Sequence, residues 1–394
     1  MNLCHGTLLS LTMILTCTAD SAHAQRVCSE RLTGFLASQQ QPSVQSNQSL
    51  VAQPIAAADT TRPAARKKNA GTTGRQVASV GQQPDRVIKN RKFRFDYAFT
   101  LHGLEHGTRV RVWLPYPIRE DDSLGTDAAQ RVTALNHNIP VKVHLNTEPK
   151  YGNRILYFEI EAPESGKLDI DVPYRVERRE VTTSSAAVRF ELRKTLRDRL
   201  LLRNERVPIT GKPTKLIAFL DLKRDPIALG RQLYDAVDSH VEYKKQGTGW
   251  GQGDVLWVCD SKYGNCTDFH SLFISLARSR KLPSLFEIGF PIPVGKKSGS
   301  VSGYHCWAWF FPDGRQPVPV DISEADKHPE LKDYYFGNLS ADRISFSLGR
   351  DLDLVPQQSA SPLNYFVYPH VEVDGKLLPK NQIKLRFSFQ DLMD

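Results

Sequence analysis

Three short segments of the sequence contain residue types that suit attack on a carbonyl carbon. The first is YGNCTDFH at residues 263–270, in which Cys266 stands where an amphipathic helix over residues 266–280 is expected to begin. The free N–H groups and the dipole at a helix N-terminus favour a negative charge, so they lower the pKa of a thiol and can hold an oxyanion. Cys266 is therefore the candidate nucleophile.

The other two segments supply a histidine and a carboxylate. GYHCWAW at residues 303–309 contains His305, and PVPVD at residues 317–321 ends at Asp321. If these two strands pair through the turn at residues 312–314, Asp321 lies beside His305. The carboxylate would then fix the imidazole tautomer and stabilise its cation. The imidazole would pair with the thiolate and protonate a departing amine.

Taken in this order, the motifs resemble the core of the transglutaminase-like superfamily, whose members share a papain-like Cys-His-Asp triad on a helix packed against a sheet. The resemblance covers residues 225–330, about a quarter of the chain. It implies that Cys266 is the nucleophile, His305 the general base and acid, and Asp321 the orienting carboxylate. The family's further oxyanion donor, upstream of the cysteine, has three candidates here, Trp250, Gln252 and Trp257.

The resemblance implies a cysteine enzyme that acts on amide bonds, of a peptide or of a glutamine side chain, through a thioester, and the N-terminal sequence adds the expectation that it is exported. Water as the acyl acceptor gives a hydrolase or protease, and an amine gives an acyltransferase. No metal or organic cofactor is implied. The alternative is a non-catalytic transglutaminase-like binding or scaffold protein of the cell envelope. The usual Ile-Pro-Ala-Arg after the nucleophile helix is Leu-Pro-Ser-Leu at residues 282–285, which bears on substrate preference more than on catalysis.

Other polar residues near the triad have two interpretations each. Cys259 and Cys306 form a disulfide or are packed thiols, and the sequence does not choose between these states. Asp268 and His270 lie in the first turns of the helix, where helix-end electrostatics explains them better than substrate contact. The glycine-rich run at residues 247–253 is a mobile loop or lines the cleft.

The wider periodicity predicts an α+β fold with an N-terminal antiparallel β-sandwich, and the resemblance implies that a papain-like, transglutaminase-like α+β domain follows it. We expect the sandwich over residues 91–200 and the catalytic domain over residues 201–394. Asp225 and Pro226 begin an amphipathic helix over residues 226–243. Alternating apolar residues predict strands over 93–99, 109–114, 141–145, 155–160, 168–172, 286–290, 304–311, 318–322, 365–373 and 383–389.

The N-terminal part of the sequence predicts export to the periplasm or the extracellular space. Residues 1–24 have the short apolar core and the Ala-His-Ala ending of a signal peptide. Residues 25–90 are rich in polar and basic residues with few large apolar groups, which predicts a disordered linker. No later apolar run reaches the ~20 residues of a membrane-spanning helix, so we expect no transmembrane segment after signal cleavage.

The formal net charge of +9 is concentrated in one segment, because residues 61–95 contain ten Lys and Arg and a single acid, Asp85. The rest of the chain is nearly balanced, which argues against a specific nucleic-acid partner. The expected partners are a protein or peptide substrate and, through residues 61–95, an anionic cell-envelope polymer. The same segment is also explained as a solvated tether.

Overall fold

Alternating aromatic residues near residue 90 form a long strand of an antiparallel sheet. In this computed structural model, which describes residues 89–117, 129–183 and 190–393, β1 (Asn90–Leu101) buries Phe93 and Phe95 fully. The strand order is β11-β18-β1-β6-β3. The other strands of this sheet are β3 (Gln130–Ala134), β6 (Leu168–Arg179), β11 (Ser298–Ser300) and β18 (Ile383–Asp391).

A second five-stranded antiparallel sheet has the order β17-β16-β2-β5-β4. Its alternation is clearest in β2, where Val110 and Val112 are fully buried. Its strands are β2 (Arg109–Tyr116), β4 (His144–Thr147), β5 (Arg154–Glu161), β16 (His370–Val373) and β17 (Lys376–Leu377). The packing of these two sheets as a sandwich stays a prediction.

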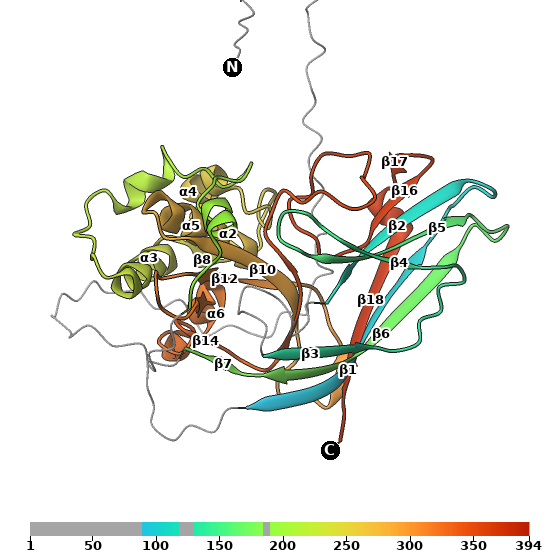
Figure 1. Ribbon diagram of the computed structural model, residues 1–394, viewed down its shortest axis with the longest axis horizontal. Helices are drawn as coiled ribbons and strands as arrows, with labels where there is room; N and C mark the ends of the chain where they lie inside the picture. The colour runs from blue at the N-terminus through green and yellow to red at the C-terminus, as the bar shows by residue number, and fades with distance from the viewer. Residues whose placement is uncertain (1–88, 118–128, 184–189, 394) are drawn as a thin grey trace, which may run out of the picture. The chain divides into compact units, whose positions relative to one another are not determined.

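Strands from both ends of the described chain share these two sheets (Figure 1). β18 pairs with β1, with Phe389 opposite Phe95, and β16 pairs with β2, with His370 opposite Trp113. We expected a boundary at residue 200 with all later strands in the catalytic domain. That expectation is wrong for β11, β16, β17 and β18, because strand pairing joins segments far apart in sequence.

A four-stranded antiparallel sheet, in the order β13-β12-β10-β15, supports the helices. Helix α5 (Cys266–Ser279) packs against β10 and β12 and carries the apolar face predicted from its sequence. Gly289 in β10 permits the close pairing with β15, since a Cβ there would lie 1.8 Å from the Ile344 carbonyl oxygen. The strands are β10 (Ser284–Pro291), β12 (His305–Phe310), β13 (Val318–Val320) and β15 (Arg343–Leu348).

The remaining elements are short, apart from α3 (Pro226–His240). Its N-cap is Asp225, as predicted, and the Asp225 side chain accepts hydrogen bonds from two backbone N–H groups of the first turn. The other helices are α2 (Lys194–Arg199), α4 (Val255–Ser261), α6 (Ile322–Lys327), η1 (Pro213–Ile217), η2 (Pro329–Leu331) and η3 (Lys380–Gln382). Two strand pairs complete the fold, β7 (Val181–Thr182) with β14 (Asn338–Leu339) and, in parallel, β8 (Glu242–Tyr243) with β9 (Tyr263–Gly264).

The N-terminal predictions fall mostly outside the described residues. The signal peptide at residues 1–24 and all but the end of the linker at residues 25–90 lie there. The last part of the basic segment is not a free tether, because it forms β1, where Arg91 pairs with Asp342 at 2.7 Å and with Asp391 at 2.9 Å. Within the described ranges, none of the helices has the length and apolar character to span a bilayer.

Candidate active site

Cys266 is the first residue of α5 and is 2% exposed. Asn265 caps the helix by accepting a hydrogen bond from the Thr267 N–H at 2.9 Å. Asp268 reciprocates by accepting one from the Asn265 N–H at 2.8 Å. The N–H of Cys266 has no hydrogen-bond partner among the described residues. It is therefore free to donate to the oxygen of an acyl group bonded to the neighbouring sulfur.

His305 begins β12, and Asp321 directly follows β13. The two strands pair antiparallel as the sequence predicts, with Ala308 opposite Val320. This pairing brings His305 Nε2 to 2.8 Å from Asp321 Oδ2, and both side chains are buried. Asp321 is also the N-cap of α6 and accepts a hydrogen bond from the Glu324 N–H at 3.3 Å. The carboxylate is thus held from both the sheet and the helix.

Arg343 of β15, which no sequence motif marks, contacts the same carboxylate. Its Nη1 lies 3.1 Å from Asp321 Oδ2, and the side chains are 4% and 0% exposed. Its guanidinium carbon lies 4.6 Å from the centre of the Trp307 ring. Burial alone raises the pKa of Asp321, but the charges of His305 and Arg343 outweigh burial and hold that pKa well below its usual range. Asp321 is therefore ionised at neutral pH.

Cys266 and His305 each shift the pKa of the other toward its charged form. Burial raises the pKa of Cys266, but hydrogen bonds with Cys306 and His305 and the imidazolium charge lower it well below its usual value. Burial lowers the pKa of His305, whereas Asp321 and Cys266 together raise it to about 9. Because Nε2 bonds Asp321, Nδ1 is left for the sulfur. These directions favour a thiolate and an imidazolium over a neutral pair.

His270 joins the two helix starts of the site. Its Nδ1 donates to the Cys266 carbonyl oxygen at 2.7 Å, and its Nε2 accepts from the Ile322 N–H at 3.0 Å. The second bond requires an unprotonated Nε2, which fixes the Nδ1–H tautomer. Burial lowers the pKa of His270 to about 4, so the ring is neutral at pH 7. His270 therefore links the first turn of α5 to the first turn of α6.

Part of the chain that contains this site matches a known protein family. Residues 218–322 match the family model described as the transglutaminase-like superfamily. The chain carries a transglutaminase-like domain. The matched range contains Cys266, His305 and Asp321 together with α3, α4 and α5. The family expected from the sequence motifs is confirmed.

Three individual proteins are similar to the chain. An uncharacterized protein of Haemophilus influenzae is 30% identical over 188 residues, which are 40% of this chain and 51% of that protein. The chain therefore spans about half the length of the curated relative it matches. A candidate cysteine protease from Cytophaga hutchinsonii aligns at 12% identity with a TM-score of 0.48, over 77% of this chain and 99% of that one. The periplasmic domain of TgpA from Pseudomonas aeruginosa aligns at 14% identity with a TM-score of 0.30, over 59% and 91%.

The glycine-rich loop of the transglutaminase-like domain is bonded to the nucleophile helix. The N–H groups of Gly251 and Gly253 donate to the Asp268 carboxylate at 2.6 and 2.9 Å. Asp268 therefore accepts three backbone hydrogen bonds, two of them from this loop. Its electrostatic role in the first turn was predicted, but its contact with the loop was not. The loop is thereby fixed beside Cys266.

The three candidate oxyanion donors differ in the contacts that their side chains make. The indole N–H of Trp250 donates to the Gly247 carbonyl at 3.1 Å, so it already has a partner. Trp257 packs its ring against Tyr263 at 5.4 Å between centroids. Gln252 stands between the two glycines that bond Asp268, and its side-chain oxygen is buried with no partner in the described part of the chain. That oxygen can only accept a hydrogen bond, so an oxyanion would have to be met by the N–H groups of the same side chain.

The disulfide weighed for Cys259 and Cys306 is not present, since both are free thiols, as is Cys266. Cys259 lies in α4 and is half-buried, and burial raises its pKa to about 11. Cys306 lies in β12 and contacts α5, with its sulfur 3.7 Å from Thr267 Oγ1 and 3.8 Å from His270 Nδ1. Each thiol has its own neighbours, and Cys306 is among the groups that lower the pKa of Cys266.

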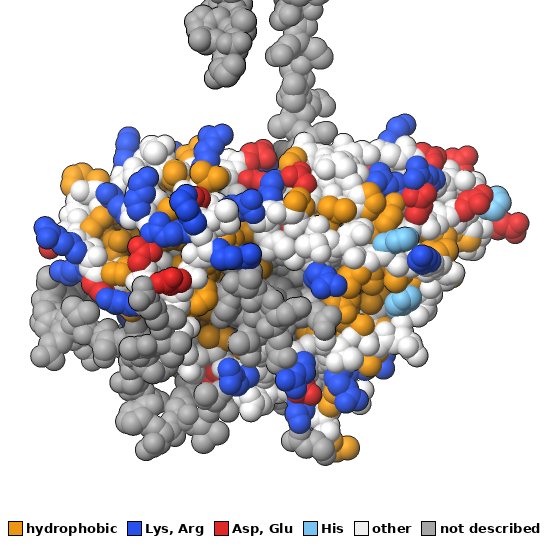
Figure 2. All heavy atoms as spheres, in the orientation of Figure 1, with side chains coloured by type: hydrophobic (Ala, Val, Ile, Leu, Met, Phe, Trp, Pro, Cys, Tyr) orange, Lys and Arg blue, Asp and Glu red, His pale blue; other side chains and the backbone are white. Residues whose placement is uncertain are grey.

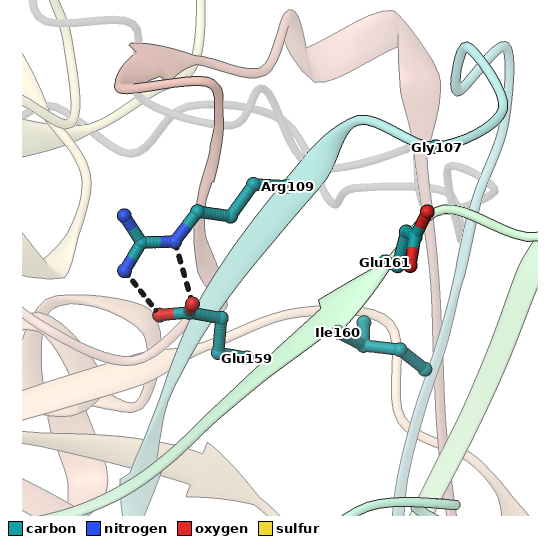
Figure 3. A pocket seen from close by; sticks show the side chains of 5 residues that line it. All are labelled: Gly107, Arg109, Glu159, Ile160 and Glu161. Atoms are coloured by element: carbon teal, nitrogen blue, oxygen red, sulfur yellow. Dashed lines mark hydrogen bonds and ion pairs between the residues drawn. The ribbon is translucent and has the colours of Figure 1, made fainter.

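Two hollows on the described surface are lined by residues other than the triad. One, of about 300 Å³, is lined by Gly107, Arg109, Ile160 and two glutamates of the second sheet (Figure 3). Its arginine is already paired with Glu159 at 2.5 Å. Another, of about 500 Å³, borders α3. Across the described ranges, no group of three or more His, Cys, Asp or Glu side chains is arranged to hold a metal ion.

Proposed function

We propose that this protein is a cysteine enzyme that cleaves or transfers amide bonds of a peptide or a glutamine side chain. The observation that carries the proposal is the 2.8 Å hydrogen bond between His305 and ionised Asp321, on an imidazole whose charge also lowers the pKa of Cys266. A nucleophile, a base and an orienting carboxylate in mutual contact are the parts that acyl transfer requires.

In the proposed acylation, the Cys266 thiolate attacks the amide carbon and a C–S bond forms. The carbonyl π electrons move to oxygen, and the oxyanion is held by the Cys266 N–H and the side-chain amide of Gln252. His305 then gives its Nδ1 proton to the amide nitrogen as the C–N bond breaks. The amine leaves, and the acyl group stays on sulfur as a thioester. Asp321 keeps the ring in place throughout.

The acceptor decides the product. Neutral His305 takes a proton from water, which attacks the thioester and releases a carboxylic acid. A primary amine used in the same way yields a new amide. We propose hydrolysis as the main reaction and transamidation as the competing one. Neither step calls for a metal or an organic cofactor.

The cellular setting is proposed from the sequence alone. The apolar core and the Ala-His-Ala pattern of residues 1–24 support export, followed by cleavage of the signal peptide.

We further infer that the two five-stranded sheets pack as a sandwich. This inference is supported by one cluster of buried side chains that includes both Phe95 of the first sheet and Val112 of the second. A protein or peptide substrate and an anionic envelope polymer are the proposed partners.

The first test replaces Cys266 by Ala and profiles the full chain against Gln-containing and peptide acyl donors, with and without a primary amine. We expect loss of turnover by more than about a thousandfold, with the unfolding midpoint little changed. Cys259→Ala is the matched control and should keep full activity. Accumulation of a thioester on Cys266, seen by mass spectrometry, would identify the intermediate. Equal turnover by Cys266→Ala and the wild type would refute the function.

A further inference from the structure

Lys245 and Lys327 lie against the aromatic rings of Tyr243 and Trp250, close to the first turn of α5. The centre of this group is Tyr243 of β8, which lies opposite Gly264 in the parallel pairing of β8 with β9. The ring of Tyr243 lies 6.3 Å from the ring of Phe269 in the first turns of α5. Its backbone N–H donates to Asp326 of α6 at 2.9 Å. Tyr243 therefore lies between the start of α5, where Cys266 is placed, and α6.

Two ammonium groups approach the Tyr243 ring from different elements. Lys327 of α6 places its Nζ 4.4 Å from the ring centre, and Lys245 places its Nζ 5.7 Å from the same centre. Lys245 also lies 5.9 Å from the centre of the Trp250 ring. Such contacts hold a cation by its attraction to the ring face. The aromatic rings thus keep both ammonium groups at one place.

In the part of the chain that the structure describes, only one of the two lysines is paired with an acid. Lys327 forms an ion pair with Glu324 of the same helix, whereas Lys245 makes no ion pair with the described residues. The negative charge of Cys266 acts on both lysines, and the two lysines repel each other. Both therefore lie within electrostatic range of the sulfur and of one another. Figure 2 shows other basic side chains over the helical part of the face it displays.

We propose that Lys245 and Lys327, held over Tyr243, bind a carboxylate of the acyl donor next to the amide that Cys266 attacks. This inference rests on the proposed function and names its substrate class as acidic peptides. A carboxylate satisfies the unpaired cation, accepts charge-assisted hydrogen bonds from both ammonium groups and anchors the substrate beside the sulfur. Lys245 and Lys327 are binding residues and take no part in proton transfer.

The test uses hexapeptides with a central Ala-Ala amide that is flanked on both sides by Glu, by Gln or by Lys. For the wild type we expect kcat/KM to be highest for the Glu peptide. Lys245→Met keeps the apolar stem but removes the charge, and should lower kcat/KM for the Glu peptide about tenfold, through KM. The same variant should change the Gln peptide less than about twofold.

Lys244→Met is the matched control, because Lys244 is the neighbouring residue and its Nζ lies over Tyr263, 5.7 Å from the ring centre. It should leave the preference for the Glu peptide intact. Rising salt should weaken the Glu preference of the wild type, since the added ions screen exposed charges. Equal losses with Lys244→Met, or equal losses for the Glu and Gln peptides, would overturn the inference.

Peptide binding to Cys266→Ala separates this inference from the proposed function. Fluorescein-labelled versions of the same peptides would be titrated with that variant and with the double variant that also carries Lys245→Met. Tighter binding of the Glu peptide, lost in the double variant, supports carboxylate recognition even if no turnover is seen. Turnover that needs Cys266 but shows no difference between peptides, in rate or in binding, supports the enzyme and refutes carboxylate recognition.

Discussion

Burial and neighbouring groups have opposite effects on the pKa of the Cys266 thiol. Burial favours the neutral thiol, while the contacts with Cys306 and His305 favour the thiolate and prevail. Cys306 can stabilise the anion because burial and the neighbouring thiolate raise its own pKa well above the usual value, so it keeps its proton and donates it in a hydrogen bond. A cysteine that the sequence offered as a disulfide partner of Cys259 is thus a neighbour of the nucleophile.

Replacing Cys306 by Ala should raise the pKa of Cys266, because the thiolate loses a hydrogen-bond donor while its burial remains. The pH at which iodoacetamide labels Cys266 at half its maximal rate should move upward, measured by mass spectrometry of the labelled peptide. Cys259→Ala should leave this midpoint in place. A midpoint that stays constant, or falls, in Cys306→Ala would show that Cys306 does not support the anion.

At the scale of single elements, α5 shows why some features were predictable. The predicted helix at residues 266–280 is observed as Cys266–Ser279, because its N-cap and apolar spacing are local properties of the sequence. Helix α6 has six residues and α4 has seven, which is too few for a periodic pattern, and both were missed. Arg343 was missed for another reason. It meets Asp321 only after β15 pairs with β10, and this long-range pairing leaves no motif in the sequence.

The first turn of α5 depends on Asp268. Its carboxylate is fully buried and accepts hydrogen bonds from the N–H groups of Gly251, Gly253 and Asn265. Asp268→Ala should lower the free energy of unfolding by about 3 kcal/mol or more, since it leaves three buried donors without a partner. Urea denaturation followed by tryptophan fluorescence would measure the change.

The control is Asp254→Ala, which removes an N-cap of α4 that is not fully buried. Its expected cost is about 1 kcal/mol. Asp268→Ala should also lower kcat, because the glycine-rich loop would no longer be hydrogen-bonded to the first turn of α5. If Asp268→Ala cost no more than Asp254→Ala, the carboxylate would not hold the loop to α5.

At the scale of the whole described structure, aromatic side chains join the sheets. Phe387 of β18 packs against Phe290 of β10 at 4.4 Å and against Tyr97 of β1 at 4.9 Å between ring centroids. One residue near the C-terminal end thus contacts a strand of the first sheet and a strand of the four-stranded sheet that supports α5. The sequence predicted β18 as a strand but placed it in the wrong part of the fold, because alternation shows a buried face and not the strand's partners.

Phe387→Ala should destabilise the protein by about 3–5 kcal/mol, as expected for truncation of a buried Phe. The fluorescence of Trp113 in the second sheet and of Trp309 in the four-stranded sheet should change in the same unfolding transition. Equilibrium unfolding would therefore remain a single transition by tryptophan fluorescence and by circular dichroism. Lys384→Ala, on the same strand but not buried, should change stability by less than about 0.5 kcal/mol. Two separated transitions would show that these sheets unfold independently.

The most direct measurement of the central claim is the pH dependence of Cys266 alkylation in the wild type and in His305→Ala. The account predicts that the wild-type midpoint lies well below the ordinary thiol value of about 8.5. The thiolate is the reactive form, so the rate rises with pH through the lowered pKa. In His305→Ala the midpoint moves up, because the imidazolium no longer stabilises the anion. A wild-type midpoint at or above the ordinary value, or one that His305→Ala leaves unchanged, would contradict the thiolate–imidazolium pair.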